Sequence, residues 1–376
     1  MEPPLRSIRP LRRHLRSALL LIVTTLVVLP LASAEARFLV RSAWAEARIL
    51  AGRRPLRELI ADRATTAERR AQFELVLAAR AFAADRLGLA AKDTYTTFSD
   101  VDDGREGSSL LTVLSASPKD RLAGYHWSYP VVGSIPYKGF FDEEAAKAEM
   151  RRLERMGYDT YLRPSGAFST LGWFNDPLLS TALDDDPVEV VVTVIHEIAH
   201  NTLWVPGDAR FNESYANFVG FRGAELFFAS RGDQKAARHC AALWRDEKRL
   251  GAFYTDLEAD LQRLYGSGLP RPEVERRRTA IFAQARARLA GPLDREMEVY
   301  SGARLARTPI NNARVIAKRI YLTGLDEFDK MYELKGGDLR AGIQEIERSL
   351  KHNPSRPALE VLALMARSGS VARSAG

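Results

Sequence analysis

The chain has 376 residues, 46% of them hydrophobic, and is therefore long enough to bury a sizeable core in one or two domains. Its formal net charge is +7, but residues 1–34 hold five Arg and one Glu, so the rest of the chain carries only +3. Charges of both signs are mixed along the predicted helices, which is typical of solvated faces and argues against nucleic-acid binding. The single cysteine, Cys240, excludes an internal disulfide.

Residues 1–34 have the form of an export signal. Arginines between Arg6 and Arg16 precede an uncharged run that ends in Ala32 and Ala34, small residues that suit signal peptidase. The run is also just long enough to span a bilayer, which leaves an uncleaved membrane anchor as the alternative. In both cases the arginines stay inside, so we expect the rest of the chain in the periplasm, exported or membrane-anchored.

Residues 35–90 predict an N-terminal helical region. One helix is expected over residues 44–60, with a break between Gly52 and Pro55. A second is expected over residues 66–87, where a Thr N-cap precedes dense Ala, Arg and Leu content.

From residue 91 to residue 230 we expect mixed α+β structure, because the composition changes to Thr, Ser, Val, Tyr, Gly and Pro. The predicted elements are, in chain order, two strands (109–115 and 127–132), a helix (143–156) and two strands (158–162 and 167–174). By pattern alone, the apolar residues 188–195 are either a buried helix or a strand. N-caps at Asp184 to Asp186, a proline at position 187 and Pro206-Gly207 favour a helix over residues 187–203.

That helix carries His196, Glu197 and His200 in the pattern HExxH. Residues i and i+4 of an α-helix are about 40° apart around the axis and roughly 6 Å apart along it, so both imidazoles can reach one metal ion. Glu197 then points near the same ion, where it can deprotonate water whose pKa a catalytic zinc lowers to about 7. Two imidazoles and a carboxylate suit Zn²⁺, although other divalent ions accept the same ligands.

A catalytic zinc site needs a third protein ligand and one open position. Leu203 and Pro206 occupy the positions where metzincins continue their motif, so the ligand must lie elsewhere. We predict Glu213, in the first turn of a helix over residues 213–230, which would complete a site for one zinc ion. A first-turn carboxylate is also favoured by the helix dipole alone. Asp208 is the competing ligand, because some zinc peptidases use an Asp shortly after the second His.

Residues 231–352 predict a C-terminal helical region, and residues 353–376 a mobile tail. The helices are expected, in chain order, over residues 233–265, 271–289, 310–321 and 339–350, with glycine-rich punctuation between them.

The motif and the residues after it resemble those of gluzincins, the thermolysin-like zinc peptidases. There, Asn-Glu-x-x-x-Asp supplies the glutamate ligand and an Asp that orients a ligand histidine. Here Asn212-Glu213 matches the start, but Asn217 stands at the Asp position. The resemblance implies that the Asn217 amide oxygen orients a histidine, without the negative charge that would raise the basicity of the imidazole.

A wider set of segments is similar to the bacterial putative aminopeptidase family, over about residues 40–350. These segments are residues 167–179, 196–200, 211–216 and 311–313. The resemblance implies a secreted or lipid-anchored, gluzincin-like α+β metallopeptidase. Its small mixed sheet would precede the zinc-binding helix within the core of residues 91–230, and its C-terminal region would be mainly helical. Relatives often carry a lipobox Cys and a Cys pair near residues 127–134, both absent here.

The resemblance also implies two substrate-binding elements. The strand over residues 167–174 would lie at a sheet edge, where Thr170, Leu171, Gly172 and Trp173 could pair with an extended peptide. The alternative is a core strand with a buried tryptophan. From the C-terminal region, Tyr321 would stabilise the oxyanion of the reaction. The alternative for Tyr321 is an aromatic side chain on the face of an amphipathic helix.

Together these features predict zinc-dependent hydrolysis of a peptide or protein substrate outside the cytoplasm. The family name makes aminopeptidase activity the expectation, although the Gly-x-Met-Glu-Asn motif of the large aminopeptidases is absent. The alternatives are a zinc endopeptidase of the cell envelope and a non-catalytic, zinc-containing envelope binding or scaffold protein. An association with the membrane would depend on whether residues 1–34 are retained.

Overall fold

The computed structural model describes Trp44 and residues 46–101, 111–129, 133–140, 142–165 and 177–374. The chain divides into two units between Gly52 and Arg53. In the first unit, Trp44 and residues 46–51 are helical, so the predicted break after Gly52 is confirmed. All elements from β1 onward belong to the second unit.

The segment that carries the HExxH pattern forms helix α6 (Pro187–Thr202), so residues 188–195 are helical and not a strand. It begins where its caps predict: the Asp186 carboxylate accepts a hydrogen bond from the Val188 N–H at 2.9 Å, and Pro187 opens the first turn. Half of its 16 residues are buried, mostly Val and Ile. Burial on this scale stabilises the helix by about 1.5–3 kcal/mol per large side chain, which overrides the weak helix propensity of β-branched residues.

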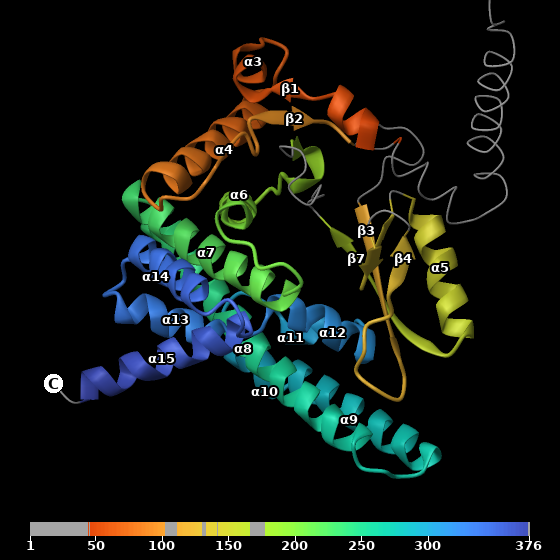
Figure 1. The fold of residues 1–376 in the computed structure, drawn as a ribbon. Helices are drawn as coiled ribbons and strands as arrows, with labels where there is room; N and C mark the ends of the chain where they lie inside the picture. The colour runs from red at the N-terminus through yellow and green to blue at the C-terminus, as the bar shows by residue number, and fades with distance from the viewer. Residues whose placement is uncertain are drawn as a thin grey trace, which may run out of the picture. The chain divides into compact units, whose positions relative to one another are not determined.

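Helices α4 (Ala67–Asp85) and α7 (Ala209–Ser230) pack against α6 (Figure 1). Two glycines of α7 allow the closest approach. A Cβ at Gly220 would lie 3.0 Å from the Val192 carbonyl oxygen, and one at Gly223 would lie 2.9 Å from Ile195 Cγ2. Larger residues would push the two helices apart, so these glycines help to set the distance between the elements that carry the metal-ligand candidates.

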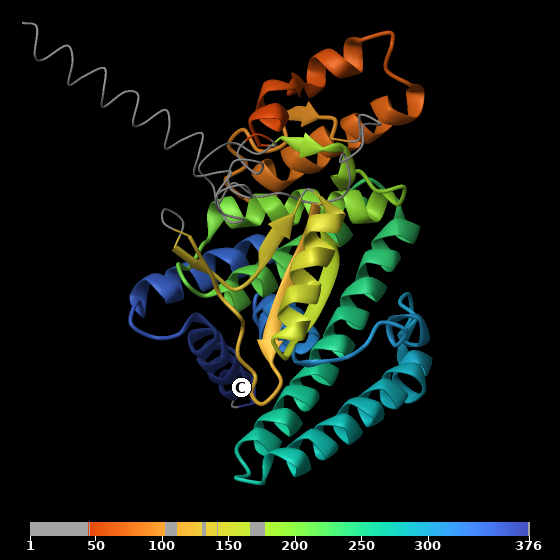
Figure 2. The same ribbon diagram turned by 90° about the vertical axis from the view of Figure 1, so that its right-hand side faces the viewer.

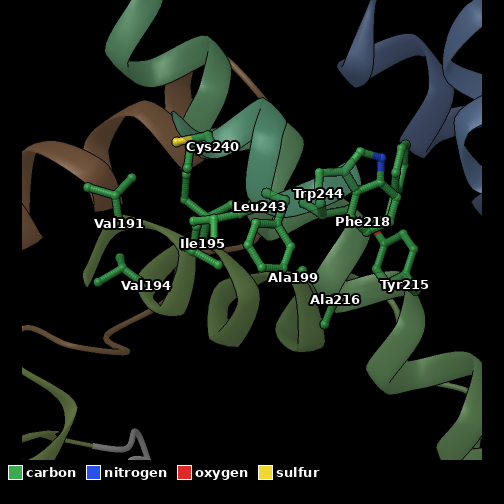
Figure 3. Packing of buried hydrophobic residues seen from close by; sticks show 14 of the residues in the cluster. Val191, Val194, Ile195, Ala199, Tyr215, Ala216, Phe218, Cys240, Leu243 and Trp244 are labelled. Atoms are coloured by element: carbon green, nitrogen blue, oxygen red, sulfur yellow. The ribbon is translucent and has the colours of Figure 1, made fainter. Parts of the chain in front are cut away.

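Helix α8 (Gln234–Tyr265) closes the core on another side of this pair. Its Cys240, Leu243 and Trp244 are buried beside Ile195 and Phe218 (Figure 3). Because the sulfur of Cys240 lies in this apolar layer, burial raises the pKa of its thiol to about 12, and the side chain acts as a small hydrophobic residue.

The sheets are small and lie before α6 in the sequence, as predicted. The largest is antiparallel in the order β6–β3–β7, formed by Lys138–Phe140, Leu111–Pro118 and Tyr158–Ser165. Helix α5 (Glu143–Arg155) packs on this sheet (Figure 2), and helix α12 (Asn312–Tyr321) contacts β3 and β7. A mixed sheet joins β1 (Arg54–Pro55), β2 (Thr97–Ser99) and β8 (Leu178–Leu179), and β4 (Trp127–Tyr129) pairs with β5 (Gly133–Ile135). The fold is therefore α+β and mostly helical.

Buried donors and acceptors tie the C-terminal helices to this core. Asp329 of α13 (Leu325–Leu334) accepts hydrogen bonds from Trp244 Nε1 at 2.9 Å, Lys248 Nζ at 2.6 Å and Arg222 Nη2 at 2.8 Å. Burial alone would raise the pKa of this carboxyl group, but the cations and donors around it lower the pKa. We name these four residues the Asp329 cluster.

The remaining helices agree only in part with the predictions. They are α3 (Leu56–Ala61), α9 (Arg271–Ala290), α10 (Pro292–Glu296), α11 (Gly302–Leu305), α14 (Leu339–His352) and α15 (Ala358–Ser374), with a 3₁₀ turn at Ser180–Ala182. Helices α10, α11 and α13 were not predicted. The predicted mobile tail instead contains α15, because Ala358, Val361 and Leu362 are buried and hold it against the protein.

Within the described ranges, no helix combines the length and the apolarity that a membrane span requires. Two predictions fall outside the described residues: the signal or anchor of residues 1–34, and the substrate-pairing residues Thr170, Leu171, Gly172 and Trp173.

Candidate metal centre

Helix α6 brings His196 and His200 together one turn apart. Their ring centroids are 4.9 Å apart, and the two Nε2 atoms lie 3.2 Å from each other. Both side chains are largely buried, with 13% and 16% of their surface exposed. The rings thus point the same nitrogen atoms at one spot, as the i, i+4 spacing predicts.

Between α6 and α7 the chain turns back toward the two histidines. Asn212 is buried and pairs with Val205 in both directions, donating to its carbonyl at 2.8 Å and accepting from its N–H at 2.8 Å. Asp208 caps α7 by accepting a hydrogen bond from the Phe211 N–H at 3.0 Å. Helix α7 therefore begins a turn earlier than predicted, and Glu213 stands in its second turn rather than its first.

Glu213 completes the cluster. Its Oε2 lies 3.4 Å from His196 Nε2 and 3.7 Å from His200 Nε2. Among the described residues, these three form the one group of His, Cys, Asp or Glu side chains whose spacing suits a metal ion. Asp208, the competing ligand, is not in this group, because its carboxylate is used as the helix cap.

The spacing of the three atoms fits zinc. Two atoms that each lie about 2.1 Å from a zinc ion at a tetrahedral angle are about 3.4 Å apart, which matches the three distances in this cluster. Neutral imidazole nitrogens and a carboxylate oxygen are acceptors, so their convergence in a largely buried place is unfavourable unless a cation or proton lies among them. The donor set therefore suits a divalent metal ion.

The electrostatics of the cluster agree with this conclusion. Burial disfavours the charged imidazolium of His196, yet its hydrogen bond to Glu213 and the charges of Glu197 and Glu213 raise its pKa above the ordinary value. Burial alone would raise the pKa of Glu213, but the two histidines lower it well below the usual range. The cluster thus keeps its carboxylate ionised and attracts positive charge.

Glu197 follows His196 in α6 and is half-buried. Among the described residues, no hydrogen bond or ion pair involves its carboxylate. The charge of Glu197 contributes to the raised pKa of His196, which places the carboxylate within electrostatic reach of the cluster.

Asn217 lies one turn beyond Glu213 in α7, close enough to His196 to contribute to the raised pKa of that imidazole. Its amide nitrogen also donates to the backbone carbonyl of Tyr321 at 3.2 Å. An Asp at this position could not donate to that carbonyl, and its charge would face another acceptor. The contact gives a physical reason for an amide where the gluzincin pattern has a carboxylate.

Tyr321 ends helix α12 and lies beside the cluster. Burial raises the pKa of its hydroxyl to about 12; Arg163 opposes that shift, while the charge of Glu213 adds to it. Arg163 donates a hydrogen bond from Nη2 to the Tyr321 hydroxyl at 3.2 Å. Tyr137, with 39% of its surface exposed, responds to the same two charges, since its pKa is raised by burial and by Glu213 and lowered by Arg163.

Sequence reasoning missed Arg163, Tyr137 and Trp204. The indole of Trp204 is 49% exposed and meets the His200 ring edge-on, at 5.5 Å between centroids. Its place shortly after HExxH was a local signal for a residue at the rim of the site. Nothing in the sequence pairs Arg163 with Tyr321, because the two are 158 positions apart.

Comparison with known protein families shows to which family the chain belongs. The sequence profile of a family described as putative aminopeptidase matches residues 37–359. No curated protein and no solved structure matches the chain. The family implies peptides as the substrate class. Since the profile covers most of the chain, this protein belongs to the putative aminopeptidase family.

Proposed function

We propose that the protein is a zinc-dependent peptidase whose metal ligands are His196, His200 and Glu213. The observation that carries the proposal is the convergence of two Nε2 atoms and one carboxylate oxygen at separations of 3.2, 3.4 and 3.7 Å. The HExxH helix and the family membership support the same reading. The proposed site is gluzincin-like, with the glutamate ligand supplied by the next helix.

Zinc at these ligands would supply Lewis acidity, which polarises a peptide carbonyl and lowers the pKa of water. Glu197 is the general base: its free carboxylate accepts the proton of the attacking water and passes it to the departing amine nitrogen. Asn217 orients His196. The Tyr321 hydroxyl donates a hydrogen bond to the substrate carbonyl oxygen as negative charge develops there.

The proposed place of action is outside the cytoplasm. The arginine-rich segment and apolar run of residues 1–34 support export, either as a periplasmic protein or as one anchored by that segment. The substrates would then be peptides of the cell envelope or its surroundings. Removal of N-terminal residues follows the family description.

The test is hydrolysis of a peptide library by the zinc-loaded wild type, Glu197→Gln and Glu74→Gln. Glu74 is an exposed residue of α4 and provides a matched control. We expect Glu197→Gln to keep its zinc and lose at least about 100-fold in kcat/KM, while Glu74→Gln stays at the wild-type rate. A wild type that binds zinc but cuts nothing beyond what Glu197→Gln cuts would support the non-catalytic alternative. Free and N-blocked versions of the best peptide distinguish an aminopeptidase from an endopeptidase.

A further inference from the structure

Arg163 is a cation at the metal centre that the proposed chemistry does not yet use. It lies on β7, paired in register with Val113 of β3, and is only partly exposed. Its Nε is buried without a hydrogen-bond partner, and no carboxylate forms an ion pair with its guanidinium among the residues that the structure describes. A partly buried guanidinium whose Nε makes no hydrogen bond and that has no counterion among the described residues is costly, so its contact with Tyr321 calls for an explanation.

The guanidinium instead contacts Tyr321 twice. Nη2 donates to the phenol oxygen at 3.2 Å, and Cζ lies 5.3 Å from the ring centroid. A phenol has one proton to donate and lone pairs that accept, whereas a guanidinium can only donate. The hydrogen bond therefore occupies a lone pair of the oxygen and turns the O–H proton away from Arg163. No described residue accepts that proton.

The other end of Tyr321 is fixed to the ligand cluster. Its backbone carbonyl accepts a hydrogen bond at 3.2 Å from the side-chain amide of Asn217, which lies one turn after Glu213 in α7. Its phenol lies within electrostatic reach of Glu213. Tyr321 is thus held at two points, by Asn217 at its backbone carbonyl and by Arg163 at its hydroxyl, which fixes the direction of the side chain between them.

We propose that Arg163 is a positioning residue that acts through Tyr321. Its hydrogen bond orients the Tyr321 hydroxyl as a donor toward the substrate oxygen, and its charge polarises the O–H bond without removing the proton. This inference rests on the proposed peptidase function. It distinguishes Tyr321 from Tyr137, which feels the same charges but makes no hydrogen bond with Arg163 among the described contacts.

The test is a double-mutant cycle on the zinc-loaded enzyme. Loss of an oxyanion donor costs about 100-fold in kcat, so we expect Tyr321→Phe and Arg163→Met each to lower kcat by roughly 10- to 100-fold with little change in KM. The pair together should be no worse than Tyr321→Phe alone. Arg163→Lys should recover part of the loss, because an ammonium group can donate the same bond. The Arg163→Met effect should persist in a Tyr137→Phe background.

A second readout does not depend on zinc or on turnover. In metal-free protein labelled with ¹³Cζ-tyrosine, the Tyr321 signal is assigned by its disappearance in Tyr321→Phe. Arg163→Met should shift that signal, whereas Arg151→Met, which removes an exposed arginine of α5, should not.

The outcomes separate the inference from the proposed function. The positioning role is wrong if the wild type is active but the losses from Arg163→Met and Tyr321→Phe multiply. It is also wrong if Arg163→Met leaves the Tyr321 signal unshifted in folded protein. Either result leaves the peptidase function standing. An inactive, zinc-loaded wild type overturns both, even if the ¹³C signal shifts. A nonadditive cycle together with a shifted signal supports the inference.

Discussion

Two polar clusters meet helix α7, and they are built in opposite ways. In the Asp329 cluster, one buried carboxylate is surrounded by the donors of Trp244, Lys248 and Arg222. In the metal-ligand cluster of His196, His200 and Glu213, two imidazole nitrogens and a carboxylate oxygen converge on one point. The first is complete as it stands and holds helices together. The second brings together the atoms that would hold a metal ion, so the comparison contrasts a candidate metal site with a structural network of similar burial.

The largest effect should come from removing a ligand from the metal-ligand cluster. Glu213→Ala should lose zinc and lower peptidase activity on the order of 1000-fold or more, because two histidines alone hold the ion weakly. Asp208→Ala is the matched control: it should keep the zinc and lose about 1 kcal/mol of stability, the cost of a lost helix cap. Zinc analysis and thermal unfolding measure both. Zinc lost from Asp208→Ala and kept by Glu213→Ala would reverse the ligand assignment.

Breaking the Asp329 cluster should change stability rather than metal binding. Asp329→Ala removes the acceptor of an indole N–H and one of the two carboxylates that pair with each of Arg222 and Lys248, so we expect the free energy of unfolding to fall by about 3 kcal/mol. Zinc content and activity of the folded fraction should stay at wild-type values. Denaturant titration followed by metal analysis checks this. A stable Asp329→Ala protein that has lost its zinc would remove the distinction between the two clusters.

A smaller effect is expected from Asn217, which connects His196 to the carbonyl of Tyr321. Asn217→Asp places a charge against that carbonyl, while Asn217→Ala removes both contacts. We expect each to lower kcat/KM by about 10-fold with zinc still bound. If Asn217→Asp is instead faster than the wild type, the contact with the Tyr321 carbonyl is not the reason why this chain has Asn rather than Asp at position 217.

The smallest effect concerns the partly buried Glu189 of α6, whose pKa shift makes stability depend on pH. Burial and the nearby charges of Asp186 and Asp184 raise its pKa from 4.5 to about 7, the reverse of the Asp329 shift. The folded protein binds this proton more tightly than the unfolded chain does. The contribution of Glu189 to the free energy of unfolding therefore falls as the pH rises from 4.5 to 7. Glu189→Gln should therefore raise the free energy of unfolding by about 1 kcal/mol at pH 8 and change little at pH 5. Equal effects at both pH values would contradict the shift.

The predictable parts of the molecule are those set by local signals. Helix α6, its Asp186 cap and the HExxH spacing follow from neighbouring residues, and so does Glu213 in the next helix. The start of α7 was misplaced because Asp208 was considered as a ligand when it acts as a cap.

Long-range contacts could not be predicted in this way. The bond between Arg163 and Tyr321 depends on how β7 and α12 meet, which no single segment encodes. Helix α13 was missed because it has only 10 residues and follows Gly324, which offers no side chain to cap the helix. The left-handed backbone of Gly324 (φ of 69°) begins the helix instead.

The central claim is that His196, His200 and Glu213 together hold one zinc ion. X-ray absorption on the purified, zinc-loaded protein tests it most directly. The account predicts one zinc per chain, with two imidazole nitrogens at about 2.0–2.1 Å, a carboxylate oxygen at about 2.0–2.2 Å and a further light-atom ligand. A chain that takes up no stoichiometric zinc, or a bound zinc whose spectrum lacks imidazole scattering, would contradict it.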